Sequence, residues 1–198
     1  MKTKFTVDSK EWSAAMLALV IMALPACKDD DEDPPAPPSV NEEELITTVR
    51  LTMVPALGGD TAVFDWLDLD GDGGNAPIII GDTLVNGAVY NASLLLLNET
   101  GNPADTISNE VANEAEAHQF FFTTTGSGLS WTAYGDVDAN GNPIGLASTW
   151  TTAGAGSGSL SVVLRHEPDK TATGVSNGDI TNAGGDTDIE VSIPFLVQ

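Results

Sequence analysis

The sequence predicts an all-β fold, built as an antiparallel β-sandwich with one short helix. Three features of the region from residue 45 onward support this prediction. Its apolar residues fall in short runs that are rich in Val, Ile, Thr and aromatic residues, several of these runs alternate apolar with polar positions, and clusters of Gly, Asn, Asp and Pro separate them. Eight short strands at such a spacing favour a sandwich of the immunoglobulin-like or a related type.

The first predicted strand covers residues 45–54, where apolar and polar residues alternate until Pro55 ends the run. A run of four leucines, 94–97, indicates a central strand. The glycine-rich stretch 154–158 lacks the lysine of a phosphate-binding loop and is predicted to be a hairpin turn. The eight predicted strands are 45–54, 61–69, 88–97, 119–125, 129–137, 146–152, 159–165 and 188–197.

The predicted helix covers residues 106–117. Ile107, Val111 and Ala115 recur at a spacing of four residues, which places them on one helical face. Asp105 or Thr106 can cap its first turn. We expect this helix to bridge two strands across one end of the sandwich.

The N-terminal region is organised around Cys27, the only cysteine of the chain. Residues 1–26 combine three lysines with an apolar run that is too short to span a bilayer, as expected of a signal peptide. Leu24-Pro25-Ala26-Cys27 resembles the lipobox of bacterial lipoproteins, which implies lipidation of Cys27. The alternative is an ordinary secretory signal with a chance cysteine.

Residues 27–44 are predicted to form an acidic, proline-rich tether. Lys28 and the acidic residues 29–33 resemble the export tag of Bacteroidetes-type lipoproteins, which implies the outer face of the outer membrane; a solvated acidic spacer is the alternative. Several acyl chains on Cys27 would anchor the protein stably. We therefore expect a lipid-anchored, cell-surface protein with one domain, residues 45–198.

The chain is strongly acidic, with a formal net charge of −22 at pH 7. Such a charge argues against binding to nucleic acid and favours cations. If Cys27 carries lipid, no thiol remains for a disulfide, for catalysis or for a metal. The cations of the predicted domain are Arg50, Arg165 and Lys170, and we expect each to be a structural counter-ion among carboxylates.

Two acidic loops match the first half of a calcium-binding loop, in which alternate oxygens converge and Gly allows a sharp turn. They contain Asp68, Asp70 and Asp72 in one loop and Asp136, Asp138 and Asn140 in the other. The twelfth loop position is Ile79 or Ala147, so an EF-hand is excluded. The sequence leaves open two interpretations, Ca²⁺ sites completed by other oxygens and tight turns that need Asp, Asn and Gly.

A second candidate metal site involves the two histidines of the chain, His118 and His166. Each lies at the end of a predicted strand with a carboxylate within two residues, Glu116 and Glu167 respectively. If the strands bring these groups together, they could bind Zn²⁺ or Cu²⁺. The alternative is two separate histidines bonded to neighbours or solvent.

No catalytic motif is present. The chain lacks a Ser-His-Asp order, a G-x-S-x-G elbow and an H-E-x-x-H helix, so we expect it not to be an enzyme. Trp66, Trp131 and Trp150 lie on predicted strands and are expected in the core.

Five segments together resemble a family of small lipoproteins often encoded near TonB-dependent outer-membrane receptors: NEEELITTV (41–49), DLDGDGGNAP (68–77), EAHQFFF (116–122), NGNPIGL (140–146) and LRHEP (164–168). Some members carry the label "type 1 periplasmic binding fold", an α/β fold that disagrees with the strand-rich pattern here. The resemblance implies a surface lipoprotein that assists a transporter. We expect a non-enzymatic accessory of a TonB-dependent transporter that binds a ligand or metal ion. A calcium-stabilised structural or adhesive module is the alternative function.

Overall fold

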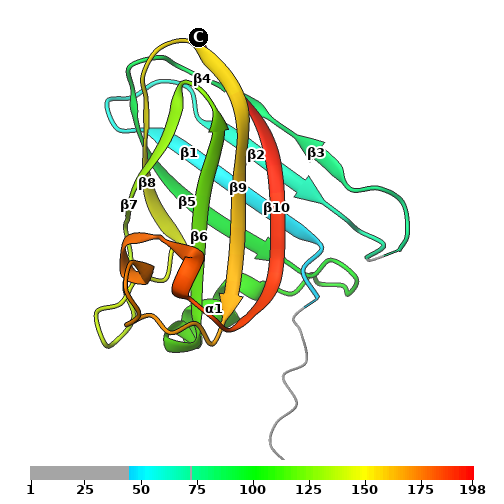
Figure 1. Ribbon diagram of the computed structural model, residues 1–198. Helices are drawn as coiled ribbons and strands as arrows, with labels where there is room; N and C mark the ends of the chain where they lie inside the picture. Colours follow the sequence, from blue (N-terminus) through cyan, green and yellow to red (C-terminus); the bar gives the residue numbers. More distant parts are fainter. Residues whose placement is uncertain (1–44, 72) are drawn as a thin grey trace, which may run out of the picture. The chain divides into compact units, whose positions relative to one another are not determined.

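Two β-sheets form the described part of the chain, residues 45–71 and 73–198, in this computed structural model (Figure 1). These residues belong to one compact unit that runs from Glu42 to Gln198. The predicted signal peptide 1–26, the tether 27–44 with Cys27, and Asp72 lie outside the described residues. Among the described residues, no helix is long and apolar enough to cross a membrane.

The larger sheet has six strands in the order β3-β2-β1-β5-β8-β7, and the smaller sheet has four in the order β4-β10-β9-β6. The six are β1 (Thr48–Pro55), β2 (Ala62–Leu67), β3 (Ile78–Ile80), β5 (Val89–Leu97), β7 (Leu129–Tyr134) and β8 (Ala147–Thr152). The four are β4 (Asp82–Leu84), β6 (His118–Gly126), β9 (Gly156–His166) and β10 (Asp186–Val197). The predicted all-β sandwich is therefore confirmed.

Neighbouring strands in both sheets are antiparallel, except that β4 runs parallel to β10. The chain crosses from the larger to the smaller sheet at Gly81, between β3 and β4. A Cβ atom at Gly81 would lie 2.1 Å from the carbonyl oxygen of Pro194, so only glycine fits this crossing.

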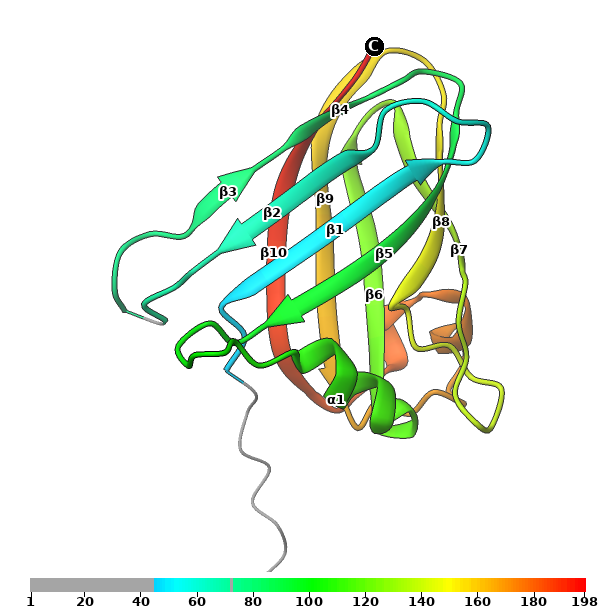
Figure 2. The ribbon, with the colours of Figure 1, turned by 180° about the vertical axis from the view of Figure 1, so that it is seen from behind.

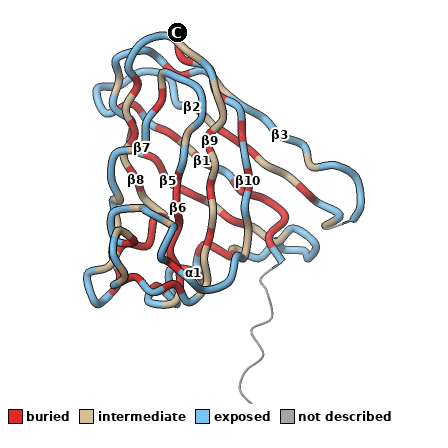
Figure 3. The backbone as a smooth tube through the Cα atoms, viewed as in Figure 1, coloured by how far each residue is buried: buried red, intermediate tan, exposed pale blue. Residues whose placement is uncertain are grey.

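The core lies between the sheets, and burial alternates along the strands (Figure 3). In β10, for example, Val191, Ile193, Phe195 and Val197 are buried while the residues between them are exposed. This period of two follows from the pleat, which points successive side chains to opposite faces. The core also contains Trp150, as the sequence predicts, whereas Trp66 and Trp131 are only half-buried and pack against it.

The predicted helix is present as α1 (Ile107–Asn113), followed by the 3₁₀ turn η1 (Ala115–Ala117), at one end of the sandwich (Figure 2). Its three predicted apolar positions are buried in the main core. At the same end, residues 168–185 form a segment with two further 3₁₀ turns, η2 (Val175–Asn177) and η3 (Ile180–Asn182). Val175 and Ala183 of this segment bury Phe121, whose neighbours Phe120 and Phe122 face the main core.

Two strands of the described region, β3 and β4, were not predicted. Each has three residues, too few to establish a period, and all three isoleucines of β3 are exposed. Both are edge strands, so their positions depend on sheet partners and not on a local pattern.

Candidate metal centre

His118 and His166 face each other across two neighbouring strands. His118 begins β6, His166 ends β9, and the antiparallel register pairs them directly. Their ring centroids are 4.6 Å apart, with an angle of 64° between the ring planes. The sequence left open whether the two histidines meet, and the pairing of β6 with β9 brings them together.

Asp188 is the third member of the site. The register of β10 against β9 shifts between Thr187 and Ile189, so Asp188 is the extra residue of a β-bulge. A bulge breaks the strict alternation of side chains and can turn a residue toward a new face. Here one carboxylate oxygen lies 3.7 Å from His118 Nε2 and the other 3.9 Å from His166 Nδ1.

These three residues form what we call the histidine cluster. One ligand atom from each lies within 4.8 Å of the others, and no other such group occurs among the described residues. The side chains of His118 and Asp188 are only 3% and 2% exposed, whereas that of His166 is 16% exposed. The site is therefore almost closed toward the core and reachable from the side of His166.

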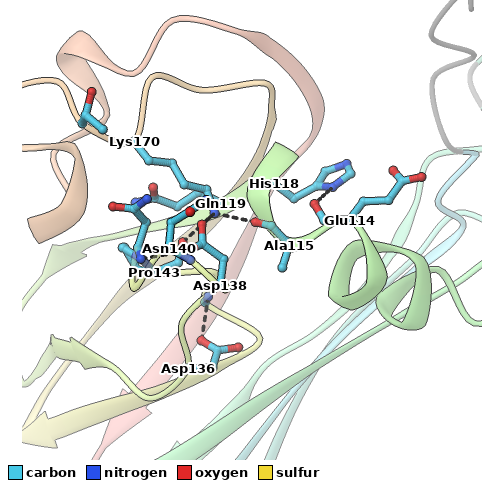
Figure 4. Close-up of polar contacts among 12 residues, drawn as sticks. Glu114, Ala115, His118, Gln119, Asp136, Asp138, Asn140, Pro143 and Lys170 are labelled. Atoms are coloured by element: carbon cyan, nitrogen blue, oxygen red, sulfur yellow. Dashed lines mark hydrogen bonds and ion pairs between the residues drawn. The ribbon is translucent and has the colours of Figure 1, made fainter.

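The backbone fixes which nitrogen of His118 faces Asp188. Nδ1 of His118 lies 3.1 Å from the carbonyl oxygen of Glu114 and must donate to it, because a carbonyl only accepts (Figure 4). In a neutral ring, Nε2 then carries a lone pair, as a metal-ligating histidine requires. Burial lowers the pKa of His118, although the Glu114 carbonyl and Asp188 oppose this effect.

The carboxylates that the sequence suggested beside the histidines lie elsewhere. Glu116 and Glu167 are both exposed, and neither belongs to the cluster of convergent ligand atoms among the described residues. The carboxylate of the site comes instead from Asp188. The alternation of side chains along β10 alone would place Asp188 on the outer face of the sheet. Only the bulge places Asp188 at the site, and no sequence pattern predicts this bulge.

A second buried polar group, the lysine cluster, lies near His118. Lys170 reaches from segment 168–185 to three acceptors, Asp138 Oδ2 at 3.1 Å and the carbonyl oxygens of Ala115 and Pro143 at 2.5 and 3.0 Å (Figure 4). All three ammonium protons therefore have acceptors, and the expected role of Lys170 as a structural counter-ion agrees with this geometry. Arg50 likewise forms a bidentate pair with Asp65.

The loop with Asp136, Asp138 and Asn140 uses its carboxylates to accept N–H groups. Oδ1 of Asp138 accepts from the main-chain nitrogens of Asn140 and Asn142, each at 2.9 Å, and Oδ2 binds Lys170. Asp136 accepts from the nitrogens of Gly145 and Ala147. Donors thus surround the oxygens that a calcium ion would need, and the geometry favours the tight-turn interpretation.

The loop with Asp68 and Asp70 has a similar arrangement in its described part. Oδ2 of Asp70 accepts from the main-chain and side-chain nitrogens of Asn75, at 2.9 and 2.6 Å. These hydrogen bonds lower the pKa of Asp70, which is exposed. Asp68 is largely buried. The third predicted ligand, Asp72, lies outside the described residues.

Comparison with other proteins adds nothing to this geometry. No protein family, curated protein or solved structure matches the chain. The chemistry of the histidine cluster is therefore inferred from its own donor atoms, burial and distances.

Proposed function

We propose that the domain binds a divalent transition metal ion, Zn²⁺ or Cu²⁺, through His118, His166 and Asp188. The observation that carries this proposal is the 3.7 Å approach of His118 Nε2 to the Asp188 carboxylate. Nε2 has no hydrogen-bond partner among the described residues. A lone pair and a carboxylate oxygen repel each other in a buried site unless a cation lies between them.

The separations suit a small metal ion. Zinc bonds to nitrogen and oxygen are about 2.0–2.2 Å long, which places tetrahedral ligand atoms roughly 3.4 Å apart. The distances of 3.7 and 3.9 Å from the histidines to Asp188 involve its two different carboxylate oxygens. One ligand atom from each of the three residues lies within 4.8 Å of the others, so metal binding requires the cluster to contract. Two imidazoles favour Zn²⁺ or Cu²⁺ over Ca²⁺, which prefers an all-oxygen shell.

A proton is the competing cation. A protonated His118 would pair with Asp188 without any metal, but burial lowers the pKa of His118 and disfavours the charged ring. A metal ion also engages His166, which a single proton between His118 and Asp188 leaves unused. The metal therefore accounts for all three side chains.

The proposed cellular role rests on the sequence. We propose a lipid-anchored protein on the outer-membrane surface, a non-enzymatic accessory that captures metal for a TonB-dependent transporter. The lipobox-like Cys27, the acidic run after it and the absence of a nucleophile–base motif support this role. The rival role, a calcium-stabilised adhesive module, has less support because Lys170 and main-chain N–H groups occupy the carboxylate of Asp138.

Thermal unfolding of the soluble fragment 42–198 tests the metal site. This fragment contains the whole compact unit and no cysteine that could compete for metal. A ligand specific for the native state stabilises it by about 2.7 kcal/mol at a hundredfold excess over Kd. We expect Zn²⁺ or Cu²⁺ to raise the Tm by several degrees and chelator to reverse the increase.

The matched variants are Asp188→Asn and Asp186→Asn, which remove carboxylates two residues apart on one strand. Asp186 is exposed and should keep the full metal response, whereas Asp188→Asn should lose most of it. Equal responses of the two variants to metal would contradict the proposed site.

Cell fractionation tests the anchor. Cys27→Ala should move the protein from the membrane to the soluble fraction. Replacing the acidic run 29–33 by alanine should leave it membrane-bound but protected from protease added to whole cells. A Cys27→Ala protein that is processed and retained like the parent would contradict the lipid anchor.

A further inference from the structure

The geometry points to a metal centre with one exchangeable coordination position, suited to a small monoanionic ligand. This inference rests on the proposed function, because it describes the metal bound by the histidine cluster. Zinc sites with four protein ligands are closed and structural, whereas three protein ligands leave a position for water or an external ligand. The first question is therefore whether the chain supplies a fourth ligand.

The side chains of the described residues supply three convergent ligands and no fourth. The main chain next to His118 is also committed to other partners. Three carbonyls of this turn, those of Glu114, Ala115 and Ala117, already accept hydrogen bonds. Moving any of them to the metal would break one of these bonds. The geometry thus leaves the fourth position of a tetrahedral ion to an external ligand.

The open position can be reached from outside. His166 is the most exposed of the three ligands, and the chain turns sharply after it, with a φ of 50° at Glu167. Gly185 passes so close to this turn that a Cβ atom would lie 2.1 Å from the carbonyl oxygen of His166. The backbone of Gly185 therefore packs tightly against this turn, and access to the site is by the exposed part of the His166 ring. A small ligand can approach the metal past the His166 ring.

Charge decides the class of the ligand. A divalent ion with two neutral imidazoles and one carboxylate keeps a net charge of +1, because Asp188 contributes a single negative charge. The surroundings of His118 and Asp188 are nearly closed to solvent, so this residual charge is poorly screened. A monoanion in the fourth position makes the centre neutral. Small monodentate anions should therefore bind better than neutral molecules of the same size.

The test uses Co²⁺, whose visible absorption bands report the number and type of its ligands, in the fragment 42–198. Co²⁺ should give the bands of a four-coordinate centre, and azide should shift them in a saturable titration with a single Kd. The same titration with perchlorate, an anion that coordinates metal ions very weakly, controls for ionic strength and should leave the bands nearly unchanged. Asp186→Asn should behave like the parent chain.

The outcomes separate the two proposals. If the fragment binds no Co²⁺, Zn²⁺ or Cu²⁺, the proposed metal site and this inference both fail. If Co²⁺ binds but its bands stay unchanged at a large excess of azide, the metal site stands and the open position is wrong. Glu167→Gln identifies the most direct alternative: a change in the azide-free spectrum of this variant would make Glu167 the fourth ligand and overturn the inference.

Discussion

The lysine cluster and the histidine cluster lie on either side of the same short turn, but their buried polar groups differ in how donors and acceptors are matched. In the lysine cluster, the three protons of Lys170 meet three acceptors, one of them the carboxylate of Asp138. In the histidine cluster, two acceptors face each other, His118 Nε2 and the Asp188 carboxylate. The first is complete without a ligand, whereas we propose that the second binds a cation.

The turn between the clusters links them. The carbonyl of Glu114 orients His118, and the next carbonyl, that of Ala115, binds Lys170 (Figure 4). The lysine cluster therefore holds the backbone that sets the tautomer of a proposed metal ligand. The comparison teaches that a buried polar group is structural when its donors match its acceptors, and is a candidate binding site when acceptors are in excess.

The largest expected effect comes from breaking the lysine cluster. Lys170→Met should destabilise the fragment by about 3–5 kcal/mol, because it leaves the buried carboxylate of Asp138 without its counter-ion. Urea unfolding measures the loss. The double variant Lys170→Met, Asp138→Asn should recover part of it, since the uncompensated charge is then absent. A Lys170→Met variant as stable as the parent would remove the structural role of this cluster.

Removing a residue of the histidine cluster should change the metal-free stability little but abolish the stabilisation by metal. His166→Leu keeps the volume at a position that is 16% exposed, and it removes a ligand whose ring donates no short hydrogen bond to the described residues. We expect the metal-free stability to change by less than about 1 kcal/mol, in the range of a site without strong partners. The increase in Tm with Zn²⁺ or Cu²⁺ should disappear. Urea unfolding without metal, followed by thermal unfolding with it, checks both parts.

The sandwich was predictable from the sequence because alternation along β1, β9 and β10 reflects a local rule, the pleat of a strand with one buried face. The helix was predictable for the same reason, from the spacing of Ile107, Val111 and Ala115. The short edge strands β3 and β4 were not, since three residues carry no period.

The candidate site was only partly predictable. The strand-end positions of His118 and His166 were visible in the sequence, but their contact required the pairing of β6 with β9. Asp188 depends on a one-residue bulge and Lys170 on a contact with Asp138, 32 residues away in sequence. Long-range pairings of this kind are set by the whole fold and leave no local pattern.

Acid should destabilise the domain moderately, through Asp138 of the lysine cluster. Burial raises the pKa of Asp138, but the N–H group of Asn142 and the ammonium of Lys170 outweigh it, so the pKa lies below its usual 3.8. A carboxylate whose pKa is lower in the folded than in the unfolded state stabilises the folded state. This stabilisation is complete at pH values above the unfolded-state pKa, and it is lost as the pH falls through the folded-state pKa. The unfolding free energy should therefore fall below about pH 4.

The control for this titration is Lys170→Met. Without the ammonium, the pKa of Asp138 should rise toward or above its usual value, and the acid-dependent loss below pH 4 should shrink. If the parent and the variant show parallel pH profiles in this range, the Asp138–Lys170 pair does not contribute to acid stability.

The smallest expected effect is that of Ca²⁺, and it probes the two acidic loops. A calcium ion needs six to eight oxygen ligands. Three of the described carboxylates of these loops, those of Asp70, Asp136 and Asp138, already accept N–H groups. We expect millimolar Ca²⁺ to change the Tm far less than Zn²⁺ or Cu²⁺, and Asp70→Ala to have the same response to Ca²⁺ as the parent. A rise of several degrees with Ca²⁺ that Asp70→Ala abolishes would instead establish a calcium loop between β2 and β3. In that case the acidic loops, like the histidine cluster, would bind cations. The acidic residues of this domain could then no longer be divided into structural residues of complete clusters and binding residues of the histidine cluster.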